Sequence, residues 1–294
     1  MLEELAASVV YTDEDRPRVR GRLLRAMLRR PLTLVGAIIV LLFAFLAIFG
    51  PMLAPHDPTA MNYSSILAPP SQAFPFGTDD AGHDVLSRVL AGAQISLSTG
   101  LVAVAIAAVI GTVLGLVAGY TGGLLDGVVM RVMDVMLAFP DILLAIVVIT
   151  ILGPGLTTVM IAVGVAGIPS YTRTVRAAVL AVREQEYVEA ARALGVPGWR
   201  IMLSHVLRNV LTPLVVLVTL SIGLAILTAA GLSFVGLGVQ PPSPEWGDML
   251  NEAQQYLQQA WWMAVFPGVA IVLVVLGLNL LGDGLREILD PALR

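Results

Sequence analysis

The chain has 294 residues, of which 57% are hydrophobic and only 13% charged, with a formal net charge of −4. Soluble domains carry about a quarter charged residues, so this composition excludes a disordered chain and argues against a soluble enzyme. The acidic balance argues against a nucleic-acid surface, and the lack of cysteine excludes disulfides, thiolate catalysis and Cys-ligated metals.

The basic residues are all arginine, 17 in number, and the sequence contains no lysine. The phosphate-binding loop of ATPases needs a lysine that reaches the β- and γ-phosphates. The chain therefore cannot be a P-loop ATPase by itself.

Six apolar segments are predicted as membrane spans, which need about 20 apolar residues each. Four of them contain no charge, namely 32–50, 93–120, 211–236 and 262–282. Two weaker spans, 132–152 and 156–172, lie between these. Residues 1–31 are predicted to be a cytoplasmic tail and not a signal peptide, because the chain starts acidic and lacks a cleavage site.

The arginines predict the orientation of the spans. With six spans, 16 arginines fall on one side and only Arg88 on the other, so the positive-inside rule places both termini in the cytoplasm. The two large external segments are then 51–92 and 237–261, both rich in proline. Trp246, Trp261 and Trp262 are interpreted as an interfacial aromatic belt at the outer end of the last span.

Charged and small residues within the spans have a structural and a functional interpretation. Asp134 and Asp141 are seven residues apart, which predicts a shared helix face; a structural role is favoured over a proton relay. Gly111, Gly115 and Gly119 follow at a spacing of four, so another helix can approach closely. This contact is either ordinary packing or a helix crossing near a translocation path.

Catalytic and metal sites are not predicted. His56, His83 and His205 are scattered without the spacing of metal ligands. No Ser-His-Asp grouping stands out, so we expect no catalytic residue, no metal and no cofactor, and a membrane enzyme is disfavoured.

The segment 173–208, on the cytoplasmic side, carries a helix–turn–helix pattern. Residues around Glu189–Leu194 favour a helix, Gly195 is typical of its left-handed end, and Pro197 follows as a stop signal. Residues 199–207 can restart as a second short helix. With Tyr187, Leu194 and Trp199 to bury, the pattern predicts either a docking element or an amphipathic helix on the membrane surface.

Several motifs resemble one family of membrane proteins. Glu189-Ala190-Ala191-x-x-x-Gly195 is similar to the EAA signature of the membrane subunits of bacterial ATP-binding-cassette importers. Three further stretches resemble the C-type permease of the dipeptide, oligopeptide and nickel branch: F-G-T-D-D-A-G-H-D-V-L-S-R at 76–88, 232–247, and 279–291. The resemblance covers roughly residues 25–294.

The resemblance implies an all-α membrane protein with the MetI-like permease fold: six transmembrane helices, with both termini cytoplasmic. Residues 32–50 would be the first transmembrane helix, 51–92 an external loop, and 93–294 the permease core. Within the core, 184–207 would be the coupling element that docks on the ATPase, through Glu189, Ala190, Ala191, Gly195 and Trp199.

The implied function is that of half a translocation pathway for di- or oligopeptides in the cell membrane. Implied partners are a homologous permease, two cytoplasmic ATPases and an external substrate-binding protein, with ATP hydrolysis left to the partners. Nickel or another small solute is the alternative cargo, and a stand-alone secondary carrier or channel is the alternative of another class. Asp79, Asp80 and Asp84 would contact the binding protein or, equally, cap a short external helix.

Two positions depart from the family pattern. His83 stands where the external motif usually has arginine, so a charge role at this position is in doubt. Arg208 stands where a proline is usual, which predicts that the second helix of the coupling element continues without a break before Asn209. Pro213 is then expected to start the fifth span.

Overall fold

The computed structural model describes residues 30–289 and is almost entirely helical. The predicted tail up to residue 29, with six of its arginines, lies outside the described residues, as do Asp290, Pro291 and Arg294. Within residues 30–289 there is no β-strand, only an isolated bridge between Thr78 and Asp84.

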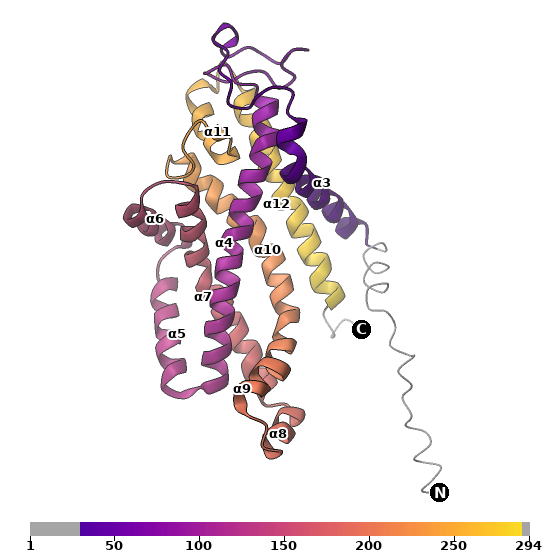
Figure 1. The fold of residues 1–294 in the computed structure, drawn as a ribbon, viewed down its shortest axis with the longest axis vertical. Coiled ribbons are helices and arrows are strands. Elements are labelled where there is room, and N and C mark those ends of the chain that lie inside the picture. Colours follow the sequence, from indigo (N-terminus) through magenta and orange to yellow (C-terminus); the bar gives the residue numbers. More distant parts are fainter. Residues whose placement is uncertain (1–29, 290–294) are drawn as a thin grey trace, which may run out of the picture.

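The helices form an elongated bundle with a small cap at one end and a helical hairpin at the other (Figure 1). The longer helices are α3 (Pro31–Leu53), α4 (Val85–Thr121), α5 (Gly123–Leu137), α6 (Asp141–Leu152), α7 (Leu156–Arg183), α10 (Leu207–Phe234) and α12 (Trp262–Leu289). The shorter elements are η2 (Tyr63–Ser65), α8 (Glu186–Ala193), α9 (Gly198–Ile201), the π-turn η3 (Met202–Val206), α11 (Trp246–Ala253) and η4 (Gln254–Tyr256).

The glycine stripe of α4 lies directly against α7. A Cβ atom at Gly115 would lie 2.5 Å from the backbone oxygen of Thr172, and one at Gly119 would lie 3.0 Å from Cβ of Val179. The two backbones therefore touch where the glycines are, as close packing of small residues in membranes requires. Of the two interpretations of the stripe, close packing accounts for it.

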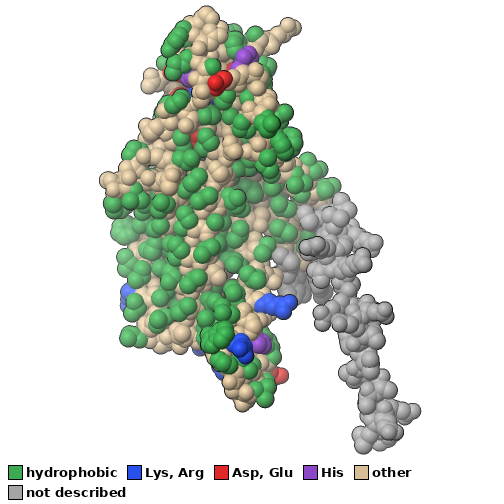
Figure 2. Space-filling view, viewed as in Figure 1, with side chains coloured by type: hydrophobic (Ala, Val, Ile, Leu, Met, Phe, Trp, Pro, Cys, Tyr) green, Lys and Arg blue, Asp and Glu red, His purple; other side chains and the backbone are tan. Residues whose placement is uncertain are grey.

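The middle of the molecule presents an apolar surface, and arginines gather at the end that carries α8 and α9 (Figure 2). Among the described residues, α3, α4, α10 with the helical turns before it, and α12 are long and apolar enough to cross a membrane, and the pair α5 and α6 makes a fifth if it counts as one span. The expectation of six spans is thus met in part.

The predicted span 132–152 is broken. Helix α5 ends at Leu137, α6 begins at Asp141, and the two axes differ by 93°. Pro140 explains the break, because its ring disfavours helical geometry in the residue before it and it lacks an N–H group. The prediction that Asp134 and Asp141 share a helix face is therefore wrong.

The fifth span begins earlier than Pro213. A continuous helical segment runs from Gly198 to Phe234, through the π-turn Met202–Val206, and Pro213 lies inside it. The predicted continuation past Arg208 to Asn209 is confirmed. The start at Pro213 is wrong, because the π-turn and α10 carry the helix through this region without a break.

Candidate functional site

The turn between α8 and α9 has the geometry expected of a helix end at a glycine. Gly195 has φ +78°, its N–H donates to the oxygen of Arg192 at 2.9 Å, and Val196 N–H donates to the oxygen of Ala191 at 3.1 Å. These bonds satisfy carbonyls that a helix end leaves free. After Pro197 the chain turns directly into α9, so two short helices form a hairpin.

The inner face of this hairpin is fixed to the bundle by apolar contacts. Val188, Ile201 and Val206 are completely buried, in one cluster with Val175 and Val179 of α7. Arg183, at the end of α7, donates to the backbone oxygen of Gly119 at 3.0 Å and so ties α7 to the end of α4. The hairpin therefore moves with α4 and α7, not as a free loop.

The outer face of the hairpin exposes two large apolar side chains, together with charged ones such as Glu189 and Arg192. Leu194 is 83% exposed and Trp199 60% exposed, and the helices α8 and α9 lie at one end of the bundle (Figure 1). Of the five residues predicted for coupling, Glu189, Ala190, Gly195 and Trp199 are exposed, whereas Ala191 is buried against the bundle. Large exposed apolar side chains grouped at a tip mark an interaction surface.

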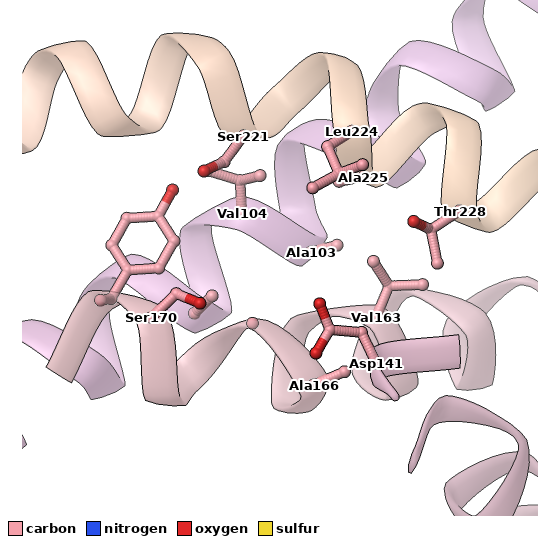
Figure 3. A pocket seen from close by; sticks show the side chains of 13 residues that line it. Ala103, Val104, Asp141, Val163, Ala166, Ser170, Ser221, Leu224, Ala225 and Thr228 are labelled. Carbon is pink, nitrogen blue, oxygen red and sulfur yellow. The ribbon is translucent and has the colours of Figure 1, made fainter. Parts of the chain in front are cut away.

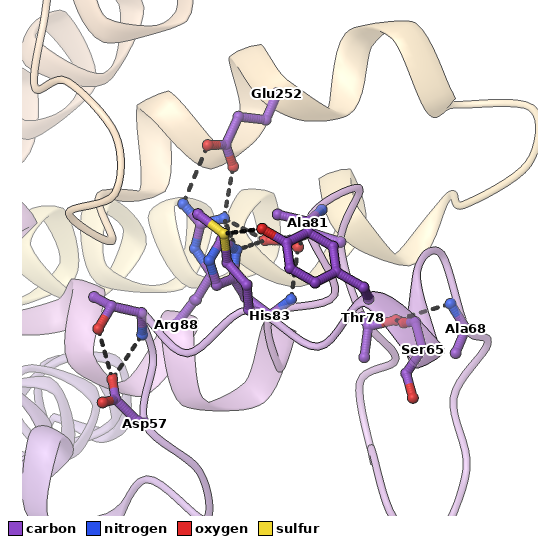
Figure 4. A network of polar contacts seen from close by, with 12 residues as sticks. Asp57, Ser65, Ala68, Thr78, Ala81, His83, Arg88 and Glu252 are labelled. Carbon is purple, nitrogen blue, oxygen red and sulfur yellow. Dashed lines mark hydrogen bonds and ion pairs between the residues drawn. The ribbon is translucent and has the colours of Figure 1, made fainter.

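The opposite end of the molecule carries a buried ionic cluster around Arg88 (Figure 4). Arg88 is 1% exposed; it pairs with Asp79 and donates to Glu252 Oε2 at 2.7 Å. Asp79 also accepts hydrogen bonds from the backbone N–H groups of Ala81 and His83 at 3.0 and 2.8 Å. The cluster joins the loop after α3, the start of α4 and the end of α11.

The three aspartates predicted for receptor contact differ in position. Asp84 is buried and caps α4, accepting from the backbone N–H of Ser87 at 3.2 Å. Asp79 is buried in the Arg88 cluster, and Asp80 lies at the surface. His83 Nδ1 lies 2.8 Å from Asp79 Oδ2, so its imidazole is a hydrogen-bonding member of the cluster beside Arg88.

Carboxylate oxygens of Asp79, Asp80 and Glu252 lie within 4.8 Å of one another. Arg88 already pairs with two of these three carboxylates, Asp79 and Glu252. The arrangement is therefore that of an internal ion-pair network, and its chemistry gives no reason to place a metal there.

Two of the three tryptophans are not interfacial. Trp246 is fully buried and donates from Nε1 to the oxygen of Val89 at 3.0 Å, and Trp262 donates to the oxygen of Thr78 at 3.0 Å. The aromatic-belt interpretation is wrong for both, because each indole N–H finds a backbone partner inside the cap. Trp261, 52% exposed, is consistent with it.

Sequence reasoning missed the acidic residues of α11. Glu245 caps this helix, accepting from the N–H groups of Gly247 and Asp248 at 3.0 and 2.9 Å. Burial, and next the charge of Glu252, raises the pKa of Asp248 to about 7. The proline-rich run before α11 hid a cap signal, Glu245 followed by a short amphipathic helix.

A pocket lies between α4, α7 and α10 and beside the first turn of α6 (Figure 3). It is open to the surface, and its lining residues Asp141, Ser170 and Leu224 are exposed. Its wall is mostly alanine, valine and leucine. The polar members are one carboxylate, that of Asp141, and the hydroxyls of Ser170, Tyr171, Ser221 and Thr228. No local pattern in the sequence indicates that these five residues meet.

Comparison with known proteins agrees with this architecture. Residues 111–294 match the family described as "Binding-protein-dependent transport system inner membrane component", and residues 21–70 match the "N-terminal TM domain of oligopeptide transport permease C". The resemblance inferred from the motifs is thus confirmed.

Curated relatives are similar over nearly their whole length. The chain is 45% identical to a probable D,D-dipeptide transport system permease protein of Escherichia coli K12, covering 99% of this chain and 97% of the relative. It is 47% identical to a di/tripeptide permease of Pseudomonas aeruginosa (88% of each chain) and 48% identical to a glutathione permease of Shigella flexneri (92% and 89%).

Among solved structures, the fold is similar to a chain of the MetNI methionine ABC transporter in an inward-facing conformation. The TM-score is 0.56 at 22% identity, covering 68% of this chain and 96% of the other. With the family match over more than half of its length, the chain belongs to the inner-membrane components of binding-protein-dependent transport systems and is a permease subunit of an ATP-binding-cassette importer.

Proposed function

We propose that this permease forms half of a translocation pathway for short peptides in the cytoplasmic membrane. It pairs with a homologous permease, is driven by two cytoplasmic ATPases and receives its cargo from an external binding protein. The printed names of the relatives support peptide cargo, since they concern dipeptides, di- and tripeptides, and glutathione. None of these names concerns nickel.

The proposed topology has six spans and cytoplasmic termini. Helix α7 would be the sixth crossing: its first half is apolar, and its arginines start at Arg173. The bent pair α5 and α6 would cross together, as one broken span. The concentration of described arginines at the end that carries α8 and α9 supports a cytoplasmic location for that end, with 32–50 as the first span and 93–294 as the core.

The coupling element 184–207 is proposed to dock on an ATPase through its exposed tip, and this is the observation that carries the proposal. Leu194 and Trp199 present apolar surface beyond the bundle, while Val188 and Ile201 tie the hairpin to it. Glu189, Ala190 and Gly195 lie on the exposed side, and Ala191 holds the first helix against the bundle. A push on the tip would therefore reach α7 and α4 directly.

The receptor face is proposed at the opposite end, at the Arg88 cluster and its loops. Asp80 would be the contact, since it lies at the surface. Asp79 and Asp84 would act indirectly, because both are buried and hold the shape of the loop.

The test is the variant Gly195→Val. A β-branched side chain at φ +78° is strained by about 1–2 kcal/mol or more, so the hairpin should open and release the tip. We expect the permease to insert in the membrane but to lose co-purification of the ATPases and ATP-dependent peptide uptake.

Gly236→Val is the matched control. Gly236 has φ +79° and, like Gly195, has no atom within 4 Å of the position that a Cβ would take, but it lies at the far end of α10. The control should keep its ATPases. Equal co-purification and uptake in wild type and Gly195→Val would overturn the docking assignment and favour a hairpin that lies on the membrane.

A further inference from the structure

The pocket beside α6 contains a carboxylate at a depth where charges are costly. Asp141 lines this pocket together with Ala166 of α7, and Ala166 precedes Arg173, the first arginine of α7, by seven residues, about 10 Å along a helix. That is about a third of the thickness of a hydrocarbon core of about 30 Å. An ionisable side chain at such a level faces a partner or a water-filled cavity, and it marks a substrate or ion pathway by default.

Asp141 differs from the other carboxylates of this region. Asp126 forms a two-point pair with Arg176 at 2.5 and 2.6 Å, and Asp134 pairs with Arg173. Asp141 is an exposed residue, and within residues 30–289 no side chain forms an ion pair or hydrogen bond with its carboxylate, which points into the open space between α7 and α10 (Figure 3).

A second group in the same pocket also lacks a partner. Tyr171 is 2% exposed, and its hydroxyl faces that of Ser221 without a hydrogen bond of ordinary geometry to any residue in the described part of the chain. A buried hydroxyl without a partner costs free energy, so the pocket favours an occupant that can hydrogen-bond. Ser170, Ser221 and Thr228 add three hydroxyls on the same walls.

From these groups we propose that the Asp141 pocket binds the ammonium group of a peptide during its passage through this subunit; this rests on the proposed peptide transport. An ammonium offers three donors and no acceptor. The carboxylate accepts one of them with charge assistance, and the hydroxyls accept from the ammonium or donate to the adjacent peptide carbonyl. The small apolar walls leave room for varied side chains.

The same chemistry disfavours a metal as the occupant. The lining contains one carboxylate and no histidine. Nickel favours imidazole nitrogen, and hard divalent ions favour several oxygen ligands with more than one carboxylate. A single charge also suits a site that the cargo occupies only in passing, because binding there must be weak enough for release.

The experiment uses the whole transporter in proteoliposomes, with its ATPases, second permease and binding protein. The probe is an equal mixture of di- and tripeptides with free and N-acetylated amino ends, and uptake is read by mass spectrometry. Because the binding protein also selects peptides, the measured quantity is the ratio of free to acetylated uptake in each variant relative to wild type.

Asp141→Asn should lower uptake of free peptides about tenfold, the worth of one charge-assisted hydrogen bond, and leave acetylated peptides unaffected. Asp141→Glu should restore part of the rate. Asp134→Asn is the matched control, since this exposed carboxylate lies outside the pocket lining and pairs with Arg173. All variants should keep the second permease and the ATPases.

Each result that differs from these expectations refutes either the pocket assignment or the proposed function. Wild-type uptake of peptides with no change of the ratio in Asp141→Asn overturns the pocket assignment alone. Loss of the second permease from Asp141→Asn overturns it too, since the carboxylate would then pair with the partner subunit. If wild type takes up no peptide with ATP, the proposed function fails, and the pocket assignment fails with it.

Discussion

The contact between α4 and α7 offers a sharp test of how the bundle is held together. In Gly115→Ala, the added Cβ would lie 2.5 Å from the oxygen of Thr172 and 2.9 Å from Cβ of Val175. Ordinary contacts of a Cβ begin near 3.4 Å. The two helices must therefore separate by about 0.9 Å here, since both obstacles are backbone or branched atoms that cannot rotate away.

The size of the effect follows from that separation. A gap of 0.5–1 Å forfeits about a quarter to a half of the dispersion attraction between facing atoms, and overpacking a core costs about 1–3 kcal/mol. Against this, alanine has a higher helix propensity than glycine, which stabilises the helix by up to about 1 kcal/mol. We therefore expect a net loss of about 1–2 kcal/mol and a melting temperature lower by several degrees in detergent, at about 2–4 °C for each kcal/mol.

Gly231→Ala is the matched control, because Gly231 lies in α10 and no atom lies within 4 Å of its Cβ position. Gly231→Ala should gain the helix propensity of alanine without a steric clash and should therefore raise the melting temperature slightly. The two variants should thus move the melting temperature in opposite directions. A rise of equal size in both would refute the close backbone contact between α4 and α7.

Three other predictions concern the cap and the topology. Asp248, whose pKa burial raises to about 7 from 3.8, holds its proton more tightly in the folded state. Its own contribution to stability should therefore be fully present below pH 4 and be lost as the pH rises through 7. Asp248→Asn should flatten this fall in melts at pH 5, 6, 7 and 8, and an unchanged slope would contradict the assignment. Arg88→Met leaves the buried carboxylate of Asp79 and the half-buried carboxylate of Glu252 without their arginine and should cost about 3–5 kcal/mol. The exposed pair removed by Arg173→Met should cost under about 1 kcal/mol, and equal melting temperatures of the two variants would contradict the cluster. A cysteine at exposed Ser71 should react with an impermeant thiol reagent in intact cells, and a cysteine at Arg183 or at exposed Glu186 only after lysis; labelling of either cytoplasmic site in intact cells would contradict the six-span topology.

Local sequence signals predicted the parts of the fold that depend on neighbouring residues. The charge-free runs at 32–50, 93–120, 211–236 and 262–282 became α3, α4, α10 and α12, since unbroken apolar length suffices to specify such helices. Gly195 predicted the helix end, because the positive φ is a property of that residue and its turn. The break at Pro140 also had a local signal, but the apolar residues on both sides of it favoured a single long span.

Contacts between distant residues were beyond such reasoning. Arg88 and Glu252 are 164 residues apart, and nothing near either residue indicates the other. Trp246 illustrates the same limit, because an indole near the end of a span has equal local character at an interface and in a buried cap. Only the fold of α11 onto the start of α4, through the bond from Trp246 to Val89, decides between these positions.

The position of the arginines on α7 connects the topology to the pocket. Arg173 and Arg176 neutralise two carboxylates of α5, but α7 has no basic residue between Leu156 and Arg173. The cost of a charge in hydrocarbon keeps arginines out of a span such as the one proposed there, and the chain bends by 93° between α5 and α6, where Asp141 begins α6. Its carboxylate therefore meets only hydroxyls and small apolar side chains within the described residues. In the proposed topology, the same charge distribution leaves one negative group available to the ammonium group of the proposed peptide cargo.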